Sequence, residues 1–567
     1  MARNPLAAMS VTTDGLISWG TEAHRLYPGK MRNALQWRPD LLTISFLVIL
    51  LGGTLVRFIG LDFGLPLTTK SDEGLVVNGA IDMVERRSFE PDRFEWPNHL
   101  GIMATYLAYV FITPLWHGIL VEQAINEVEI GYFHLVSRGV SASFGVVGIV
   151  LAYFIGKRFN KIVGVFAAAF FAFMPPYVEE SHYATPDIVL TAAILAGVLA
   201  AMVYVSKPTI PLLLVMSLMS TLSIMAKYPG ALATVVIAAV VIAAAVRDRA
   251  WTRIIGHGLI SVAAVPLFLF ILSPVMFTNR HVVLRRITHE ARSTHLGADG
   301  LNFPEKLVFY ADNYFTATGV ILLLLSVAGV WYLTRHWTLE AIPLFIGGVF
   351  WVALSTLGLH WARWGLPMYI TPLILAALGA YFVLTTVQSR WPANKWSSVG
   401  VAVVLVIALV TQVMASVAQT AQLMRPDTRV MAYNEFLERG ITRDNTLYEG
   451  YTPFRERWFD ILFDDVEERD GKLTPLDPAI EYVVIGPMQA RFSAEPERYS
   501  DEMRIYALIE EQYEVLDVYA PESPGFAVPF SNLRLMAAIQ SIGNTVSGAT
   551  GGTAFRLYVV PEELRAN

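Results

Sequence analysis

Cysteine is absent from this 567-residue chain, and charged residues are scarce. Without a thiol, the chain has no disulfide, no thiolate metal site and no cysteine nucleophile. Any chemistry must therefore come from carboxylates, histidines, lysines, arginines or tyrosines. Only 16% of the residues are charged and 54% are hydrophobic, whereas a soluble protein has about 25% and about 45–50%. This composition predicts an integral membrane protein.

A basic arm is missing as well, and the formal net charge is −6. Because phosphate backbones are bound by clustered lysines and arginines, we expect no nucleic-acid partner. The first 40 residues are polar and lack the apolar core and small-residue cleavage site of a removable signal. We expect residues 1–40 to form a cytoplasmic tail.

Apolar windows long enough to cross about 30 Å of hydrocarbon recur along the chain. They lie near residues 41–61, 99–119, 136–156, 162–180, 188–206, 208–226, 230–246, 255–277, 316–334, 340–358, 364–385 and 397–418. These windows predict a polytopic α-helical membrane domain over residues 41–419, with about 11–13 transmembrane helices.

Lysine and arginine gather in some of the short loops between these windows, notably at Lys157–Lys161 and Arg247–Arg249. Basic loops stay in the cytoplasm, so we expect a multi-pass protein of the cell membrane with a cytoplasmic N-terminus. Residues 62–98 and 278–315 then become outer loops. The parity of crossings requires window 99–119 either to be re-entrant or to pair with a second crossing.

Residues 420–567 contain no long apolar window and have a mixed polar and apolar pattern instead. Strand-like segments at 482–486 and 555–560 alternate with helix-like segments at 428–439 and 500–513. This alternation predicts a small extracytoplasmic α/β domain.

The first outer loop contains two adjacent carboxylates, Asp72 and Glu73, directly before a run of apolar residues. The spacing predicts a short amphipathic helix on the membrane surface, with Ser71 or Asp72 as its N-cap. Asp72 could therefore serve only as a cap. Alternatively, one carboxylate could accept a proton from a hydroxyl substrate at the membrane surface. The polar segment ending at His99 returns to the same surface.

A second polar patch, Pro175–Asp187, interrupts a pair of apolar windows. Its His182 and Asp187 should face a cavity or a partner, because ionisable groups are costly in lipid; a solvated loop is the alternative. Lys227 and Tyr228 lie between two further windows. A cation there requires an anion, either a carboxylate or a bound phosphate.

The outer loop 278–315 is rich in basic and aromatic residues. Its His289-Glu290 pair is not the zinc-protease motif, because the next histidine is His295. The arginines suit a lipid-linked phosphate, although a solvated basic loop would have the same composition. Arg363 stands where a later helix enters the membrane, and it could clamp a phosphate or merely snorkel to the interface.

Together, these motifs resemble the polyprenyl-phosphate-sugar-dependent glycosyltransferases of the GT-C superfamily, within them the protein O-mannosyltransferase and lipid A aminoarabinose transferase group. The resemblance rests on the Asp-Glu pair, the surface helix, the His-Tyr-Ala-Thr-Pro-Asp patch, Ala-Lys-Tyr-Pro-Gly between two windows, and the Arg-Trp-Gly-Leu-Pro helix entry. It covers residues 41 to about 390. The loop 278–315 is too short for the β-trefoil insert of the eukaryotic O-mannosyltransferases, which favours a bacterial or archaeal enzyme.

The resemblance implies an inverting transfer of a sugar from a polyprenyl-phosphate donor to an acceptor hydroxyl of a glycan, lipid or protein, at the extracytoplasmic face. It implies Asp72 as the catalytic base, assisted by Glu73. Donor-phosphate binding is implied for Lys227, Arg285, Arg286 and Arg363. Substrate binding is implied for His99, His182, Tyr183, Asp187, Tyr228, His289 and His295. No cofactor is expected; some relatives use a divalent cation, but the carboxylates here are too sparse to predict one.

Two other functions fit a membrane protein of this kind. A lipid or glycolipid flippase also needs ionisable groups within the membrane, although such transporters usually show repeat symmetry, which this sequence lacks. A membrane-anchored sensor would act through residues 420–567, but would not explain why the polar residues cluster between windows on one face.

Overall fold

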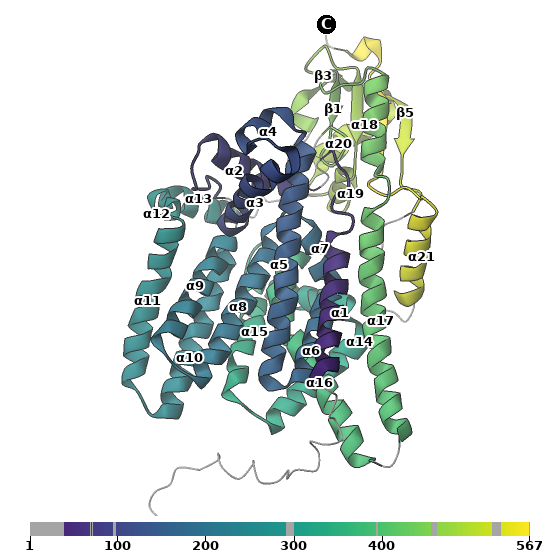
Figure 1. The fold of residues 1–567 in the computed structure, drawn as a ribbon. Coiled ribbons are helices and arrows are strands. Elements are labelled where there is room, and N and C mark those ends of the chain that lie inside the picture. The colour runs from purple at the N-terminus through teal and green to yellow at the C-terminus, as the bar shows by residue number, and fades with distance from the viewer. Residues whose placement is uncertain are drawn as a thin grey trace, which may run out of the picture.

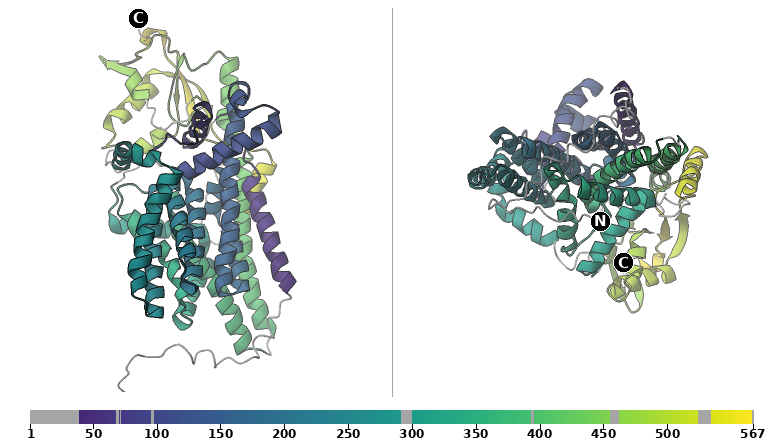
Figure 2. Two further views of the ribbon diagram at one scale, coloured as in Figure 1. Left: turned by 60° about the vertical axis from the view of Figure 1, so that its left-hand side comes forward. Right: turned by 90° about the horizontal axis from the view of Figure 1, so that it is seen from below.

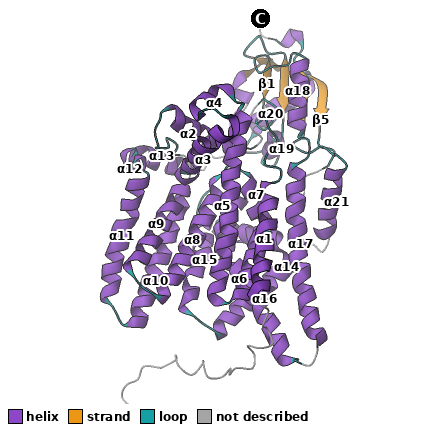
Figure 3. Cartoon of the chain, in the orientation of Figure 1, coloured by secondary structure: helices purple, strands orange, loops and turns teal. Residues whose placement is uncertain are grey.

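The computed structural model describes residues 39–67, 70, 72–94, 98–290, 300–392, 395–454, 462–523 and 534–565. These residues form a helical bundle with a small sheet region at one end (Figures 1 and 3). The predicted tail, apart from its last two residues, lies outside the described residues, as does His295.

Nine helices in the described part of the chain are long and apolar enough to cross a membrane. They are α1 (Pro39–Phe58), α3 (His99–His117), α5 (Ile130–Phe159), α8 (Pro186–Ser206), η1 with α10 (Tyr228–Leu232, Ala233–Asp248), α11 (Thr252–Leu272), α14 (Phe303–Arg335), η3 with α16 (Ala362–Gly365, Leu366–Arg390) and α17 (Lys395–Leu423).

Three more apolar stretches are shorter or bent. A pair formed by α6 (Lys161–Ala172) and α7 (Pro175–His182) is bent by 54° and counts as a tenth span if taken as one. The others are α9 (Ile210–Ala226) and η2 with α15 (Leu339–Phe345, Ile346–Ser355). Every predicted apolar window therefore falls on a helix, and the polytopic helical fold is confirmed. The described residues supply nine or ten possible spans and not the predicted 11–13, because α9 and the η2–α15 stretch are short and α6 with α7 is bent.

The helices differ in how far neighbours cover them. Within the apolar window of α8, 78% of the residues are buried, whereas in α11 only 6% are. Accordingly, α11 lies at the edge of the bundle and α8 lies inside it (Figure 1). A helix that is apolar on all sides is stable in both places, because lipid replaces protein contacts at the edge.

Short helices cover the end of the bundle that carries the sheet. They are α2 (Glu73–Glu85), α4 (Val121–Glu127), α12 (Val275–Thr278) and α13 (Arg280–Glu290). The apolar helix α3 lies among them and packs on α2, α4 and α5 (Figures 1 and 2). Window 99–119 thus lies at the sheet end of the bundle (Figures 1 and 2).

The C-terminal region contains a four-stranded sheet in the order β1-β4-β6-β5, in which only β1 and β4 are parallel, and a separate β2-β3 hairpin. The strands are β1 (Thr446–Tyr448), β2 (Val466–Arg469), β3 (Lys472–Pro475), β4 (Tyr482–Ile485), β5 (Glu514–Tyr519) and β6 (Phe555–Val559). The helices are α18 (Thr428–Glu438), η4 (Leu462–Asp465), α19 (Met488–Ser493), α20 (Ser500–Gln512), α21 (Arg534–Val546) and η5 (Glu562–Leu564).

The side chains of β4 alternate between the two faces of the sheet, and a helix covers each face. Val483 packs in one apolar cluster with Ile509 of α20, and Val484 packs in another with Phe436 of α18. Successive side chains of a strand point to opposite faces, so the two helices cover the two faces. The predicted strands and helices correspond to β4, β6, α18 and α20, and the small α/β region is confirmed.

Helix α16, which follows η3 and its Arg363, packs very closely on α14. A Cβ atom on Gly379 would lie 1.8 Å from the Leu325 carbonyl oxygen, and one on Gly329 would lie 1.9 Å from that of Leu375. Small residues allow such backbone approach between membrane helices. The α14–α16 interface therefore requires glycine at both positions.

We expect Gly379→Ala to destabilise the protein by about 1–3 kcal/mol, because the added methyl group forces α14 and α16 apart. Thermal unfolding in detergent measures this change. Gly348→Ala is the matched control, since a Cβ there meets no atom within 4 Å. Equal midpoints for the two variants would contradict the proposed interface.

Candidate functional site

Four charged side chains from distant parts of the sequence meet at the sheet end of the bundle. Arg363 Nη1 lies 2.5 Å from Asp72 Oδ2, and Arg363 Nε lies 3.8 Å from Asp187 Oδ2. Lys227 Nζ donates a hydrogen bond of 2.7 Å to Asp187 Oδ1. We call these four residues the charged cluster. The structure thus brings together four of the residues predicted from sequence, in alternating sign.

Each member of the cluster stands at the end of a helix. Asp72 precedes α2, Asp187 lies in the first turn of α8, Lys227 follows α9, and Arg363 lies in η3 before α16. Asp72 occupies the N-cap position, but its side chain makes no capping hydrogen bond. Its carboxylate is directed to Arg363 instead, so capping does not account for Asp72.

Burial increases from one side of the cluster to the other. The side chains of Arg363 and Asp72 are 21% and 14% exposed, whereas those of Lys227 and Asp187 are 8% and 2% exposed. Burial lowers the pKa of Lys227, which lies in the turn between α9 and η1, and the Asp187 carboxylate opposes this shift. The Asp72–Arg363 pair is therefore the more exposed side of the cluster.

Two atoms of the cluster have unused hydrogen-bonding capacity. Asp187 Oδ2 and Arg363 Nε are buried and have no hydrogen-bond partner among the described residues. They are 3.8 Å apart, which is too long for a direct hydrogen bond. A substrate hydroxyl could accept from Arg363 Nε and donate to Asp187 Oδ2.

Aromatic and polar side chains surround the cluster. Lys227 Nζ lies 5.0 Å from the centroid of the Trp364 ring, and Lys70 Nζ lies 4.2 Å from that of Tyr183. These are cation–π distances. Glu180, which we had not selected from the sequence, is buried and accepts a 3.0 Å hydrogen bond from Thr185 Oγ1. The predicted residue Tyr183 thus lies beside a cation and not within the ion pairs.

Glu73 does not join the cluster. Its two carboxylate oxygens accept hydrogen bonds of 2.9 and 2.7 Å from Arg138 of α5, and one also accepts from the Ala184 amide. Both side chains of the pair are fully buried. Since both oxygens are occupied, this geometry indicates a structural role for Glu73 and gives no support to its assisting Asp72.

His99 and Tyr228 secure the segment before α3. The His99 ring nitrogens lie 2.8 Å from the Arg93 carbonyl oxygen and 2.6 Å from Ser273 Oγ. The Tyr228 hydroxyl donates to the Phe94 carbonyl oxygen at 2.9 Å. These contacts occupy the polar atoms of His99, so its described role is to tether the chain.

The remaining predicted site residues lie elsewhere. His182 is buried with its ring nitrogens 2.8 and 3.0 Å from the carbonyl oxygens of Val178 and Ile59. Arg285 and His289 are exposed on α13, and Arg286 is partly exposed there. The ion pairs of the charged cluster do not involve α13.

Two buried arginines were missed by the sequence analysis, although both lie inside predicted apolar windows. Arg138 partners Glu73. Arg57 of α1 donates to the carbonyl oxygens of Phe171 and Ala172 at the end of α6, and to Ser181 Oγ of α7. These contacts span the 54° bend and satisfy carbonyls left free where α6 ends. An arginine within an apolar window was the available signal.

The described residues contain no group of three histidine or carboxylate side chains placed to hold a metal ion. Asp72 and Asp187, the carboxylates of the cluster, are instead neutralised by Arg363 and Lys227. The chemistry available there is proton transfer, hydrogen bonding and stabilisation of negative charge.

These features define a multi-pass helical membrane protein with a charged cluster at one end of its bundle. Residues 131–277 match the family model described as dolichyl-phosphate-mannose-protein mannosyltransferase. The resemblance to this group is therefore confirmed over that stretch, which contains Arg138, Asp187 and Lys227 but neither Asp72 nor Arg363.

Two crystal structures of ArnT from Cupriavidus metallidurans are similar to the chain, one bound to undecaprenyl phosphate and one in the apo state. Their TM-scores are 0.43 and 0.41, each with 14% sequence identity over 70% of this chain and 73% of ArnT. No curated protein matches the chain in sequence.

We expect Glu73→Gln to destabilise the protein by about 3–5 kcal/mol, because it leaves the Arg138 guanidinium buried without its counter-charge. Thermal unfolding and the yield of folded protein measure this loss. Glu340→Gln is the control, since the Glu340–Arg158 pair is partly exposed and should contribute at most about 1 kcal/mol. A fully stable but inactive Glu73→Gln variant would instead point to a catalytic role.

Proposed function

We propose that this protein is a membrane glycosyltransferase that moves a sugar from a polyprenyl-phosphate donor to an acceptor hydroxyl. The observation that carries the proposal is the charged cluster at one end of an apolar bundle, in which the partly exposed Asp72 pairs with Arg363 and Asp187 pairs with Lys227. The family match over residues 131–277 supports it.

The proposed reaction is a single displacement at the anomeric carbon. The acceptor oxygen forms a bond to that carbon while the bond from the carbon to the phosphate oxygen breaks, so the anomeric configuration inverts. Asp72 takes the proton of the acceptor hydroxyl. The lipid phosphate leaves with the bonding electron pair.

The cations of the cluster would stabilise the departing phosphate. Arg363 presents a planar fork of donors that suits phosphate oxygens, and Lys227 supplies a compact second charge. Asp187 holds both cations in place and, through its free Oδ2, can accept a hydrogen bond from a sugar hydroxyl. Arg285 and Arg286 on α13 remain proposed contacts to the donor, as His182, Tyr183 and His289 do to sugar or acceptor.

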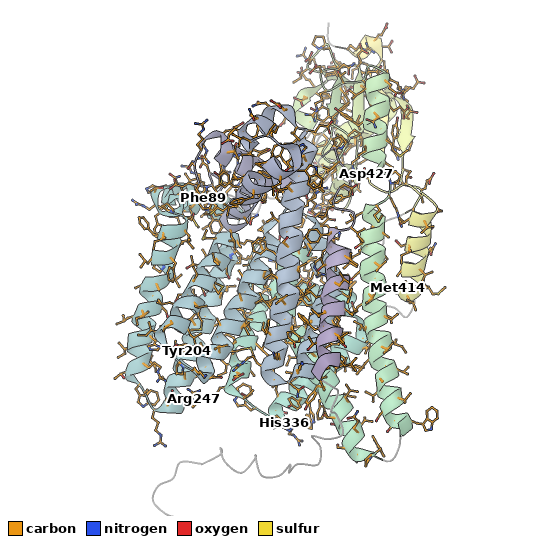
Figure 4. The ribbon with its side chains drawn as sticks, viewed as in Figure 1. Phe89, Tyr204, Arg247, His336, Met414 and Asp427 are labelled. Atoms are coloured by element: carbon orange, nitrogen blue, oxygen red, sulfur yellow. The ribbon has the colours of Figure 1, made fainter. Side chains whose placement is uncertain are left out.

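We further propose that the cluster and residues 420–567 face the outside of the cell, above a catalytic domain of residues 41–419. Figure 4 labels Asp427 at the sheet end of the bundle and Arg247 and His336 at the opposite end. The basic side chain of Arg247 therefore lies away from the sheet. Lysine and arginine mark the cytoplasmic side of membrane proteins.

A lipid or glycolipid flippase is the alternative function, because it too would bind a lipid phosphate with buried cations. Incubating the purified protein with a polyprenyl-phosphate sugar and a mixture of acceptors separates the two. Release of free polyprenyl phosphate supports transfer. Movement of intact donor across vesicles, without its cleavage, would favour the flippase.

We expect Asp72→Asn to lower kcat by on the order of 10²-fold or more, since it removes the proposed base. The donor KM should change little, and the variant should remain folded. Asp82→Asn is the control, because Asp82 lies on α2, shortly after Asp72, but pairs with Arg93 outside the cluster. Unchanged kcat in Asp72→Asn would exclude Asp72 as the base.

We expect Arg363→Ala to weaken donor binding about tenfold to a hundredfold. The variant loses the proposed charge-assisted hydrogen bond to the donor phosphate, and such a bond contributes about 1.5–3 kcal/mol. Acceptor binding should change less. The binding of polyprenyl phosphate, measured by calorimetry, checks this expectation. Arg335→Ala, at the exposed end of α14 over Trp331, is the control. Unaltered donor affinity in Arg363→Ala would mean that Arg363 only positions Asp72.

A further inference from the structure

Helix α21 is part of the C-terminal region in sequence but packs along α17 (Figure 1). Hydrogen bonds fix its last turns to the end of α17. Arg425 donates to the Ser541 carbonyl oxygen and hydroxyl at 2.8 and 2.9 Å and to Thr545 Oγ1 at 3.0 Å. Thr545 Oγ1 donates to the Ala421 carbonyl oxygen at 3.2 Å.

These contacts determine how deep α21 lies. Because the last turns of α21 meet the last turns of α17, the two helices run side by side in the same direction. Thirteen residues of α-helix extend about 20 Å, so the start of α21 lies well below the sheet end of α17. Figure 4 agrees: Met414, labelled on α17, lies level with α21, and Asp427 lies beyond it. The apolar window of α17 covers Trp396–Leu423, so α21 is level with its membrane-spanning part.

The outward face of α21 is mostly apolar, although Gln540 is also exposed on it. Met536, Ile539 and Val546 are 64%, 49% and 84% exposed. Their spacing places them on one side of the helix. The other side, with Ala538 and Ser541, is buried. No residue from Leu535 to Val546 carries a charge.

The lipid-facing side of α17 continues this surface. Exposed apolar side chains on α17 include Ile407 and Val410. Exposed residues of that kind on a membrane-spanning helix are covered by acyl chains. A helix at the same depth, charged only at its first residue, Arg534, and with a mostly apolar face outward, meets the same environment, and all its interior backbone groups are bonded within the helix.

We propose that α21 is embedded in the membrane leaflet on the sheet side, with Met536, Ile539 and Val546 against lipid acyl chains. The C-terminal region is then anchored in the membrane by α21, in addition to its link through α17. This anchor holds the sheet close to the membrane surface beside the charged cluster. The inference does not depend on the proposed transferase activity.

The absence of cysteine makes the test direct. Single cysteines are introduced by Met536→Cys, Ile539→Cys and, as the control, Val518→Cys, each labelled with an environment-sensitive fluorophore. Val518 on β5 is 64% exposed, the same as Met536, but lies in the sheet. The full-length protein is reconstituted in phosphatidylcholine vesicles that contain nitroxide-labelled lipid, with the nitroxide near the headgroup or near the chain end.

We expect lipid nitroxides to quench most of the fluorescence at positions 536 and 539, and aqueous iodide to quench little. Position 518 should show the reverse. Strong iodide quenching at 536 and 539 would overturn the proposal, because α21 would then lie in water. Weak quenching by both agents would also overturn it, since a second protein surface would then cover the helix.

Discussion

The arrangement of this protein depends on one constraint: a charge placed in an apolar bundle must find its partner inside the protein. Glu73 and Arg138 satisfy this constraint with a fully buried, two-point ion pair. The pair joins the first turn of α2 to α5, and the Ala184 amide bonded to Glu73 adds the turn before α8. Asp72 and Asp187 stand immediately beside these anchored points. The position of the charged cluster is therefore fixed by a neighbouring ion pair that takes no part in the proposed chemistry.

The buried guanidinium of Arg57 also finds its partners inside the protein, at the bend between α6 and α7. It offers its guanidinium donors to carbonyl oxygens and one hydroxyl, and thereby stabilises the end of α6 at the point where Pro175 and Pro176 begin α7. Without a bend there, α6 and α7 would form one straight span, and the turn that leads into Asp187 would be displaced. Arg57 and Arg138, which are buried within the membrane-spanning region, thus hold neighbouring helices together. Arg363 and Lys227 lie at helix ends instead, where the proposed substrate would bind.

The sequence predicted the helices and strands best where a single local property, such as apolar length or strand alternation, determines the element. Length and apolarity alone placed all twelve helical windows, and strand alternation placed β4 and β6. The adjacent carboxylates Asp72 and Glu73 show where such reasoning ends, because they are chemically alike and consecutive. One is partly exposed and pairs with Arg363, and the other is fully buried against Arg138. Only the direction of each side chain at the start of α2 separates them, and that direction depends on what α5 and η3 place nearby.

The sequence by itself determined that this chain is a polytopic membrane protein without thiol chemistry, since composition and apolar runs depend on no distant contact. It also identified Asp72, Asp187, Lys227 and Arg363 as polar groups that needed partners. The tertiary structure alone decided that these four residues are one another's partners, because the contacts join residues as far apart as Asp72 and Arg363. It likewise placed α21 beside α17, a contact between segments that are separated along the chain by strands β1 to β5.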